Sequence, residues 1–232
     1  MHEHPALPAL RQTISRLEEG RRHSSCTIPI TAAIDRWLPQ GGLPTGCIHE
    51  IKGSSLASAV AFSAILSARL AGEQGHILYL APDYSLHPIG LLPYGVKPAQ
   101  VLHVATKRSQ DLAWAAMEAL RCSQVSSVMA ILDGLDLTAS RRLQLAAEAS
   151  GATGFLLGRA TSAPIASPIT RWKVSPVIDK SRQGFDEPLW SIDLLYCRGG
   201  RPGRWTLEWR GRALNPLPVP SVERTALEAL AG

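Results

Sequence analysis

The 232-residue sequence contains no apolar run that approaches the ~20 residues needed to cross a bilayer. Its start, MHEHPALPALRQ, lacks the apolar centre of a secretory signal, so export is not expected. Only four cysteines occur, far apart and without metal-type pairing, which favours reduced thiols over disulfides or a zinc site. We therefore expect a cytoplasmic protein with no bound metal.

Signatures of common enzymes are also missing. No G-x-S-x-G nucleophile elbow occurs, and no G-x-G-x-x-G follows an expected strand. The seven histidines are scattered, and the only histidine–carboxylate grouping at metal-ligand spacing is the terminal His2-Glu3-His4. These absences count against an ordinary hydrolase, a dinucleotide-dependent enzyme or a metalloenzyme.

Positive charge is concentrated in one part of the chain, whose formal net charge is +5. Residues 159–212 contain ten Lys/Arg and five carboxylates, whereas the rest of the chain contains fourteen of each sign. An arginine-rich surface attracts phosphates or acidic proteins, so we expect a patch that binds DNA or an acidic partner, with a merely solvated face as the alternative. The expected patch consists of Arg171, Lys173, Arg198, Arg201, Arg204 and Arg210.

Hydrophobic spacing divides the chain into an arm, a core domain and a tail. Residues 1–23 are expected to form an amphipathic helical arm that packs on its own domain or on a neighbouring protein. The apolar positions of this arm are Leu7, Leu10, Ile14 and Leu17. Residues 24–212 are expected to form the core domain, and residues 213–232 a proline-rich linker followed by a short helix that Ser221 caps.

Strand and helix patterns alternate through the first part of the core domain. The expected strands cover residues 47–51, 76–81, 101–105, 125–133 and 154–160, and the expected helices cover residues 55–72, 109–123 and 138–150. This alternation predicts a doubly wound, mainly parallel α/β sheet. After residue 160, two segments of period-two alternation joined by a Gly/Pro turn predict a C-terminal antiparallel hairpin.

The tryptophans allow more than one interpretation. Trp172, between Arg171 and Lys173, fits either a base-stacking group or a buried strand position, and the buried position is preferred. Trp37 and Trp114 lie on helical patterns and are expected in the core. In the first strand of the hairpin, one shared face is expected to carry Trp190, Ile192, Leu194 and Tyr196.

The stretch ITAAIDRWLPQGGLPTGCIHEIKG, residues 30–53, resembles the approach to the nucleotide loop in the RecA recombinase family. Its most specific parts are the Gly-Gly-Leu-Pro-x-Gly run and the Glu-Ile-x-Gly sequence that follows it. The resemblance covers roughly residues 6–200 in the order of elements and is strong in sequence over about 28–60. It implies a RecA-like core, with residues 1–23 in the place of the recombinase's polymerisation arm.

The loop after this stretch departs from the family's phosphate-binding motif. A working loop reads G-x-x-x-x-G-K-[ST], in which backbone N–H groups cradle phosphates, the lysine neutralises them and the hydroxyl holds Mg²⁺. Aligned at Gly53, this chain has Ser58, Ala59 and Val60 at the second glycine, the lysine and the hydroxyl. Lys52, just before the loop, is the alternative source of charge. Because phosphoryl transfer depends on these contacts, we expect no ATP hydrolysis and no cofactor.

Other functional elements of the family are also reduced. The resemblance implies that Asp133 stands where the family has its magnesium-organising aspartate and Asp111 where it has its water-activating glutamate, although a cap or turn role is preferred for both. Only residues 161–167 separate the last parallel-type strand from the segment that follows, which leaves little room for a DNA-binding loop. A standard recombination filament is therefore not expected.

The length, the degenerate loop and the Trp/Arg-rich C-terminal region together resemble the ImuA family. This resemblance implies a non-catalytic accessory subunit of the damage-inducible (SOS) translesion-synthesis machinery, working at the nucleoid with ImuB, a polymerase homologue, and an error-prone DnaE-type polymerase. RecA, DNA and further copies of the chain are additional candidate partners. A SulA-like cell-division inhibitor and a divergent DNA-dependent ATPase are the alternative functions.

Overall fold

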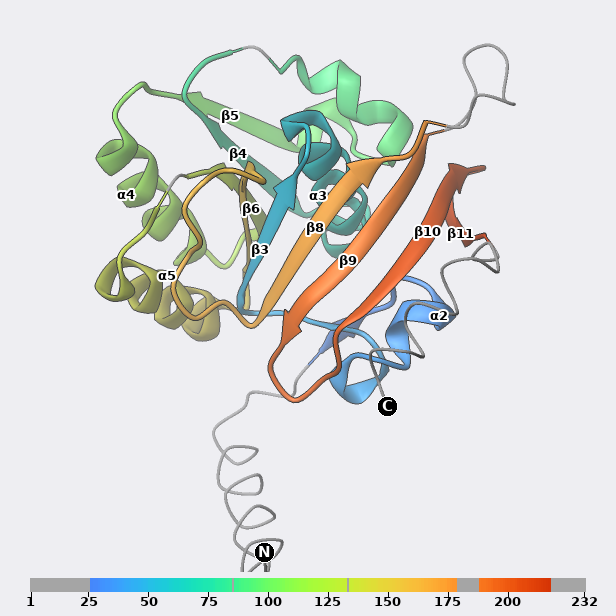
Figure 1. Cartoon of the computed structure of the whole chain (residues 1–232). Coiled ribbons are helices and arrows are strands. Elements are labelled where there is room, and N and C mark those ends of the chain that lie inside the picture. Colours follow the sequence, from blue (N-terminus) through green and yellow to red (C-terminus); the bar gives the residue numbers. More distant parts are fainter. Residues whose placement is uncertain (1–25, 85, 133, 179–187, 218–232) are drawn as a thin grey trace, which may run out of the picture.

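The computed structural model describes residues 26–84, 86–132, 134–178 and 188–217, and the fold is built around one large sheet. Its strand order is β11-β10-β9-β8-β3-β7-β6-β4-β5 (Figure 1). The mutually parallel strands are β3 (Ile48–Gly53), β4 (His76–Ala81), β5 (Val101–Ala105), β6 (Val125–Ile131), β7 (Thr153–Arg159) and β8 (Thr170–Pro176). The antiparallel strands are β9 (Leu189–Cys197), β10 (Gly203–Arg210) and β11 (Ala213–Pro216).

Helices cover both faces of the parallel part (Figure 1). Helix α3 (Leu56–Ala71) packs on one face, where side chains of the β3, β7 and β8 strands join its Phe62 in the larger core cluster. Helices α4 (Ser109–Leu120) and α5 (Leu137–Ser150) pack on the other face over a second cluster. Apolar residues on both faces of each central strand explain the continuous hydrophobic runs in the sequence. The predicted doubly wound α/β sheet is confirmed.

The segment before β3 folds onto the same core as α3. Strand β1 (Thr27–Ile28) pairs with β2 (Leu43–Pro44), and between them lie α2 (Ala32–Asp35) and the 3-10 helix η1 (Pro39–Gly41). Thr31 caps α2 with its side-chain oxygen, and Ile34 and Leu43 are fully buried in the larger cluster. Two further 3-10 helices, η2 (Pro88–Tyr94) and η3 (Pro98–Gln100), connect β4 to β5.

The C-terminal part of the sheet contains two departures from expectation. Residues from 213 onward were expected to form a linker, but Ala213–Pro216 form strand β11, which pairs antiparallel with β10. Tyr196 was expected on the buried face of β9. It is 42% exposed, because the pairing passes from Arg171↔Tyr196 to Trp172↔Leu194 and so leaves an extra residue on β9. Such a bulge reverses which face the following side chains occupy.

Two expected segments lie outside the described residues: the N-terminal arm with its Leu7, Leu10, Ile14 and Leu17 stripe, and the short helix after Ser221. Within the described part of the chain, none of the helices combines the length and apolarity that crossing a membrane requires.

Candidate functional site

The connection between β3 and α3 is much shorter than the loop that the resemblance suggested. Strand β3 runs through Gly53, helix α3 begins at Leu56, and only Ser54 and Ser55 lie between them. A Cβ on Gly53 would lie 2.0 Å from the carbonyl oxygen of Ser55, so the chain folds back tightly over this glycine. Glycine is required here because of this close backbone approach.

The backbone N–H groups of this connection are bonded within the protein. The Ser54 N–H donates to the carbonyl oxygen of Val174 in β8 at 3.1 Å. The Ser58 N–H donates to the Ser55 side chain, which caps α3. In a phosphate loop such N–H groups point at the anion. Here the Ser54 N–H is bonded to strand β8, and the Ser58 N–H is bonded within the helix cap.

Residues at the expected phosphate-binding positions face the core. Ser58, Ala59 and Val60 lie in the first two turns of α3 and are 6%, 0% and 7% exposed. The small side chain of Ala59 allows α3 to pack directly on the sheet. A lysine at this position would have to leave the core to carry its charge in water.

The positive charge of Lys52 is directed away from the connection. Its ammonium group donates to the carbonyl oxygen of Ser162 and lies 3.5 Å from the carboxylate of Glu50. Glu50 is fully buried, and it also forms an ion pair with Arg171 and accepts a 2.8 Å hydrogen bond from the Ile165 N–H. Sequence reasoning did not identify this cluster, because its partners lie more than one hundred residues apart in the chain.

The cluster also fixes the short β7–β8 loop. Both backbone polar groups of Ile165 are bonded: its N–H donates to Glu50, and its carbonyl oxygen accepts a 2.8 Å hydrogen bond from Arg171. The β7–β8 loop is therefore anchored to β3 and β8 by charged side chains. Hydrogen bonds to charged groups are stronger than neutral ones, so this anchoring is substantial.

The structure does not bring Asp111 to this region. Asp111 lies in the first turn of α4, directly after β5, and forms a 3.7 Å ion pair with Arg108. Strand β5 is four strands from β3, or about 19 Å at the usual strand spacing. Asp111 thus lies at a helix end, and its preferred structural role stays a prediction. Asp133, the other remnant carboxylate, lies outside the described residues.

A second buried polar cluster lies where the Gly-Gly-Leu-Pro-x-Gly run meets the sheet. His49 is fully buried, with Nε2 2.9 Å from the carbonyl oxygen of Pro44 and Nδ1 2.7 Å from the hydroxyl of Thr170. Because a carbonyl oxygen only accepts, we infer that Nε2 carries the proton. Burial lowers the pKa of His49 to about 4, and burial raises the pKa of the neighbouring Cys47 thiol to about 12. The cluster therefore has a structural role: it joins residues 41–46 to β8.

The cysteine, histidine and acidic side chains are the remaining candidates for metal ligands. All four cysteines are free thiols, with Cys26 and Cys122 exposed and the other two buried. Across residues 26–217, apart from the undescribed positions, no three His, Cys, Asp or Glu side chains converge to form a metal site.

The expected basic patch is not one compact surface. Arg171 pairs with buried Glu50, Arg204 pairs bidentately with Asp193 at 2.7 and 3.2 Å, and Arg210 lies 3.9 Å from Glu208. Arg198 and Arg201 lie in the β9–β10 turn, and Lys173 is exposed on β8. The turn and Arg210 stand at opposite ends of β10, roughly 24 Å apart at the usual rise per residue.

The tryptophans divide differently from the expectation. Trp172 is fully buried and donates a 2.6 Å hydrogen bond to Thr170, so its preferred interpretation as a core residue is confirmed and base stacking is wrong. Trp114 was expected in the core but is 63% exposed. Helix α4 uses Leu112 and Ala116 to face the sheet, which leaves Trp114 on the opposite side.

Comparison with known proteins identifies the family. No family model matches the chain. The protein ImuA of Caulobacter vibrioides does match, in strain NA1000 / CB15N and in strain ATCC 19089 / CIP 103742 / CB 15. Each is 32% identical over 213 residues, which span 84% of this chain and 87% of the relative. Similarity of this extent, together with the α/β fold, shows that the chain belongs to the ImuA family.

Proposed function

We propose that this protein is a non-catalytic accessory subunit of a damage-inducible translesion DNA synthesis complex. It acts with an ImuB-like polymerase homologue and an error-prone DnaE-type polymerase, in the cytoplasm and at the nucleoid. Membership of the ImuA family supports this role. RecA, DNA and a second copy of the chain are further candidate contacts of the same assembly.

The proposal that the protein is non-catalytic is supported by the short β3–α3 connection and its internal contacts. Only two residues remain in it, the N–H groups of Ser54 and Ser58 are bonded within the protein, and the charge of Lys52 is directed to Glu50. Phosphoryl transfer is catalysed almost entirely by positioning and electrostatic stabilisation. A connection with these contacts supports a scaffold role over an ATPase role.

A nucleotide-binding experiment tests this part directly. A ligand at one hundred times its dissociation constant stabilises a protein by about 2.7 kcal/mol, which corresponds to a rise in melting temperature of about 5–10 °C for a domain of this size. We expect no rise with Mg-ATP and no phosphate release, with or without single-stranded DNA. A rise of this size accompanied by hydrolysis would instead establish the divergent ATPase.

The assembly part is tested with the purified polymerase homologue and the polymerase. We expect the chain to co-elute with at least one of them in size-exclusion chromatography, and we expect deletion of its gene to abolish damage-induced mutagenesis. Overproduction that produces filamentous cells, relieved by mutations in the tubulin-like division protein, would contradict this proposal and favour the SulA-like function.

A further inference from the structure

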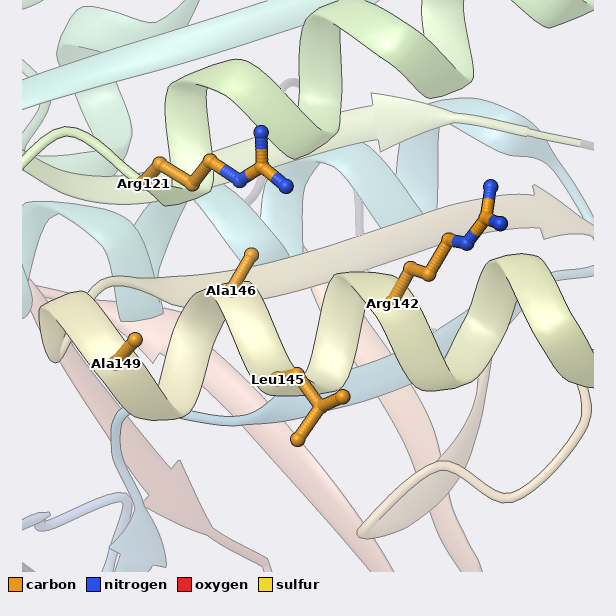
Figure 2. A pocket seen from close by; sticks show the side chains of 5 residues that line it. All are labelled: Arg121, Arg142, Leu145, Ala146 and Ala149. Atoms are coloured by element: carbon orange, nitrogen blue, oxygen red, sulfur yellow. The ribbon is translucent and has the colours of Figure 1, made fainter.

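A shallow trough of about 220 Å³ lies between α4 and α5, outside the regions described above. Figure 2 shows Arg121 at the end of α4 and Arg142 on α5 at its two ends, with Ala146 between them. Ala149 continues the apolar floor, and Leu145 forms an exposed outer lip. The trough is therefore apolar along its length and cationic at both ends.

The spacing along α4 places Trp114 on the same side of this helix as Arg121. The hydroxyl of Ser150 donates to the carbonyl oxygen of Leu120, which ties the C-terminal ends of the two helices together. Trp114 precedes Arg121 by seven residues and Arg142 precedes Ala149 by seven, which is two helical turns in each helix. Because both helices connect parallel strands and run in the same direction, Trp114 and Arg142 reach similar heights on either side of the trough.

Trp114 is the most exposed of the six tryptophans of the chain. Trp172, Trp190, Trp205 and Trp209 are at most 8% exposed, whereas Trp114 is 63% exposed. Exposed tryptophan and arginine are the residue types that most often dominate the binding energy of protein interfaces. An exposed tryptophan two helical turns from Arg121, on the same side of α4, fits an interface better than an ordinary solvated helix face.

The charges at the trough indicate the chemistry of the partner. Arg121 is neutralised in part by a 2.9 Å ion pair with Glu118. Arg142 has no ion pair or hydrogen-bond partner for its side chain among the residues that the structure describes. The nearby Glu148 is hydrogen-bonded to Gln144, at 2.7 Å. A carboxylate placed next to apolar side chains complements this arrangement.

The dimensions indicate the form of the partner. A volume of about 220 Å³ is below the 300–1,000 Å³ typical of small-molecule pockets, and the trough is only partly enclosed. A groove between two helices is a common receptor for an amphipathic helix, which inserts its apolar face. The alanine floor lets the backbone of such a helix approach closely.

We propose that the α4–α5 trough is the docking site for an acidic amphipathic helix of a partner protein in the translesion complex. Apolar side chains of that helix contact Trp114, Leu145 and the alanine floor, and its carboxylates pair with Arg142. The inference rests on the proposed function, since it assigns a surface to the partner that the function requires.

Fluorine NMR on the full chain labelled with 5-fluorotryptophan tests this assignment. The Trp114 resonance is identified by its loss in Trp114→Phe, and the purified polymerase homologue and DnaE-type polymerase are titrated in turn. We expect one partner to shift or broaden the Trp114 resonance. Arg142→Glu should weaken that binding at least about tenfold, because it opposes carboxylate to carboxylate. Arg141→Glu, one residue away and outside the trough, should stay within about twofold of the wild type.

Each remaining outcome contradicts a defined part of the reasoning. Binding of neither partner to the wild-type chain contradicts the proposed function itself. Equal binding by the wild type and Arg142→Glu, or equal weakening by Arg141→Glu, contradicts the trough alone. A Trp114 shift caused by a peptide of residues 218–232, without one from either partner, makes a second copy the occupant and overturns the assignment. Circular dichroism of each variant excludes unfolding as the cause of lost binding.

Discussion

Glu50 allows the clearest test of what the buried charges beside the β3–α3 connection contribute. Its carboxylate is fully buried, pairs with Arg171, lies 3.5 Å from Lys52 and accepts a hydrogen bond from Ile165. The side chains of Lys52 and Arg171 are 13% and 30% exposed. Replacing Glu50 by alanine leaves two poorly solvated cations side by side and removes the anchor of the β7–β8 loop.

The size of the effect follows from this burial. Removing one member of a buried ion pair typically costs about 3–5 kcal/mol. The partial exposure of Arg171 lets water recover some of this, so we expect Glu50→Ala to lower the free energy of unfolding by about 3 kcal/mol. Glu50→Gln keeps an acceptor for the Ile165 N–H and should cost about 2 kcal/mol. Glu118→Ala, which breaks the pair with Arg121 whose side chains are 43% and 58% exposed, should cost less than about 1 kcal/mol.

Urea denaturation followed by circular dichroism measures these differences. With a denaturant dependence of about 2 kcal/mol per molar, a loss of 3 kcal/mol lowers the midpoint by about 1.5 M. Hydrogen exchange should also accelerate in residues 161–167, because the loop loses its anchor. If Glu50→Ala lowers the midpoint no more than Glu118→Ala does, the cluster is not the anchor and the charge of Lys52 is free for another role.

Three further predictions concern the same region. Gly53→Ala should destabilise the fold by about 1–3 kcal/mol, because its Cβ would meet the Ser55 carbonyl oxygen, whereas Gly90→Ala, in open space, should be near neutral in the same urea assay. The pKa of His49 is lowered from 6.5 to about 4 in the folded state. The contribution of this residue to stability is therefore complete above pH 6.5, and the free energy of unfolding falls by up to about 3 kcal/mol as the pH approaches 4. Parallel curves of stability against pH for the wild type and His49→Gln would contradict this. Trp172→Ala should cost about 3–5 kcal/mol in thermal or urea unfolding, and a fully folded variant with weaker DNA binding would contradict its core role.

Much of the fold was already determined by local sequence. Continuous apolar runs such as residues 76–81 and helix patterns such as residues 56–71 specify a sheet buried on both faces, because each side chain must meet a helix. The missing lysine and hydroxyl at Ala59 and Val60 are visible in the sequence alone. These two absences predict that the loop does not bind phosphate, and the prediction requires no knowledge of how the side chains pack.

The remaining features depend on contacts between residues that are remote in the chain, so only the tertiary structure decided them. The side chains of Lys52 and Arg171 both pair with the carboxylate of Glu50. Arg171 also donates a hydrogen bond to the carbonyl oxygen of Ile165, which helps to fix the position of that residue. A single extra residue in β9 exposes Tyr196, which no period-two count reveals. Whether an apolar residue such as Trp114 is buried depends on which element packs against its helix. Periodicity shows which side chains share a face of the helix, but not whether another element covers that face. The sequence thus determined the helices and strands and the absence of a charged side chain at Ala59. Only the packing of distant segments determined where the charges of Lys52 and Arg171 and the exposed Trp114 lie.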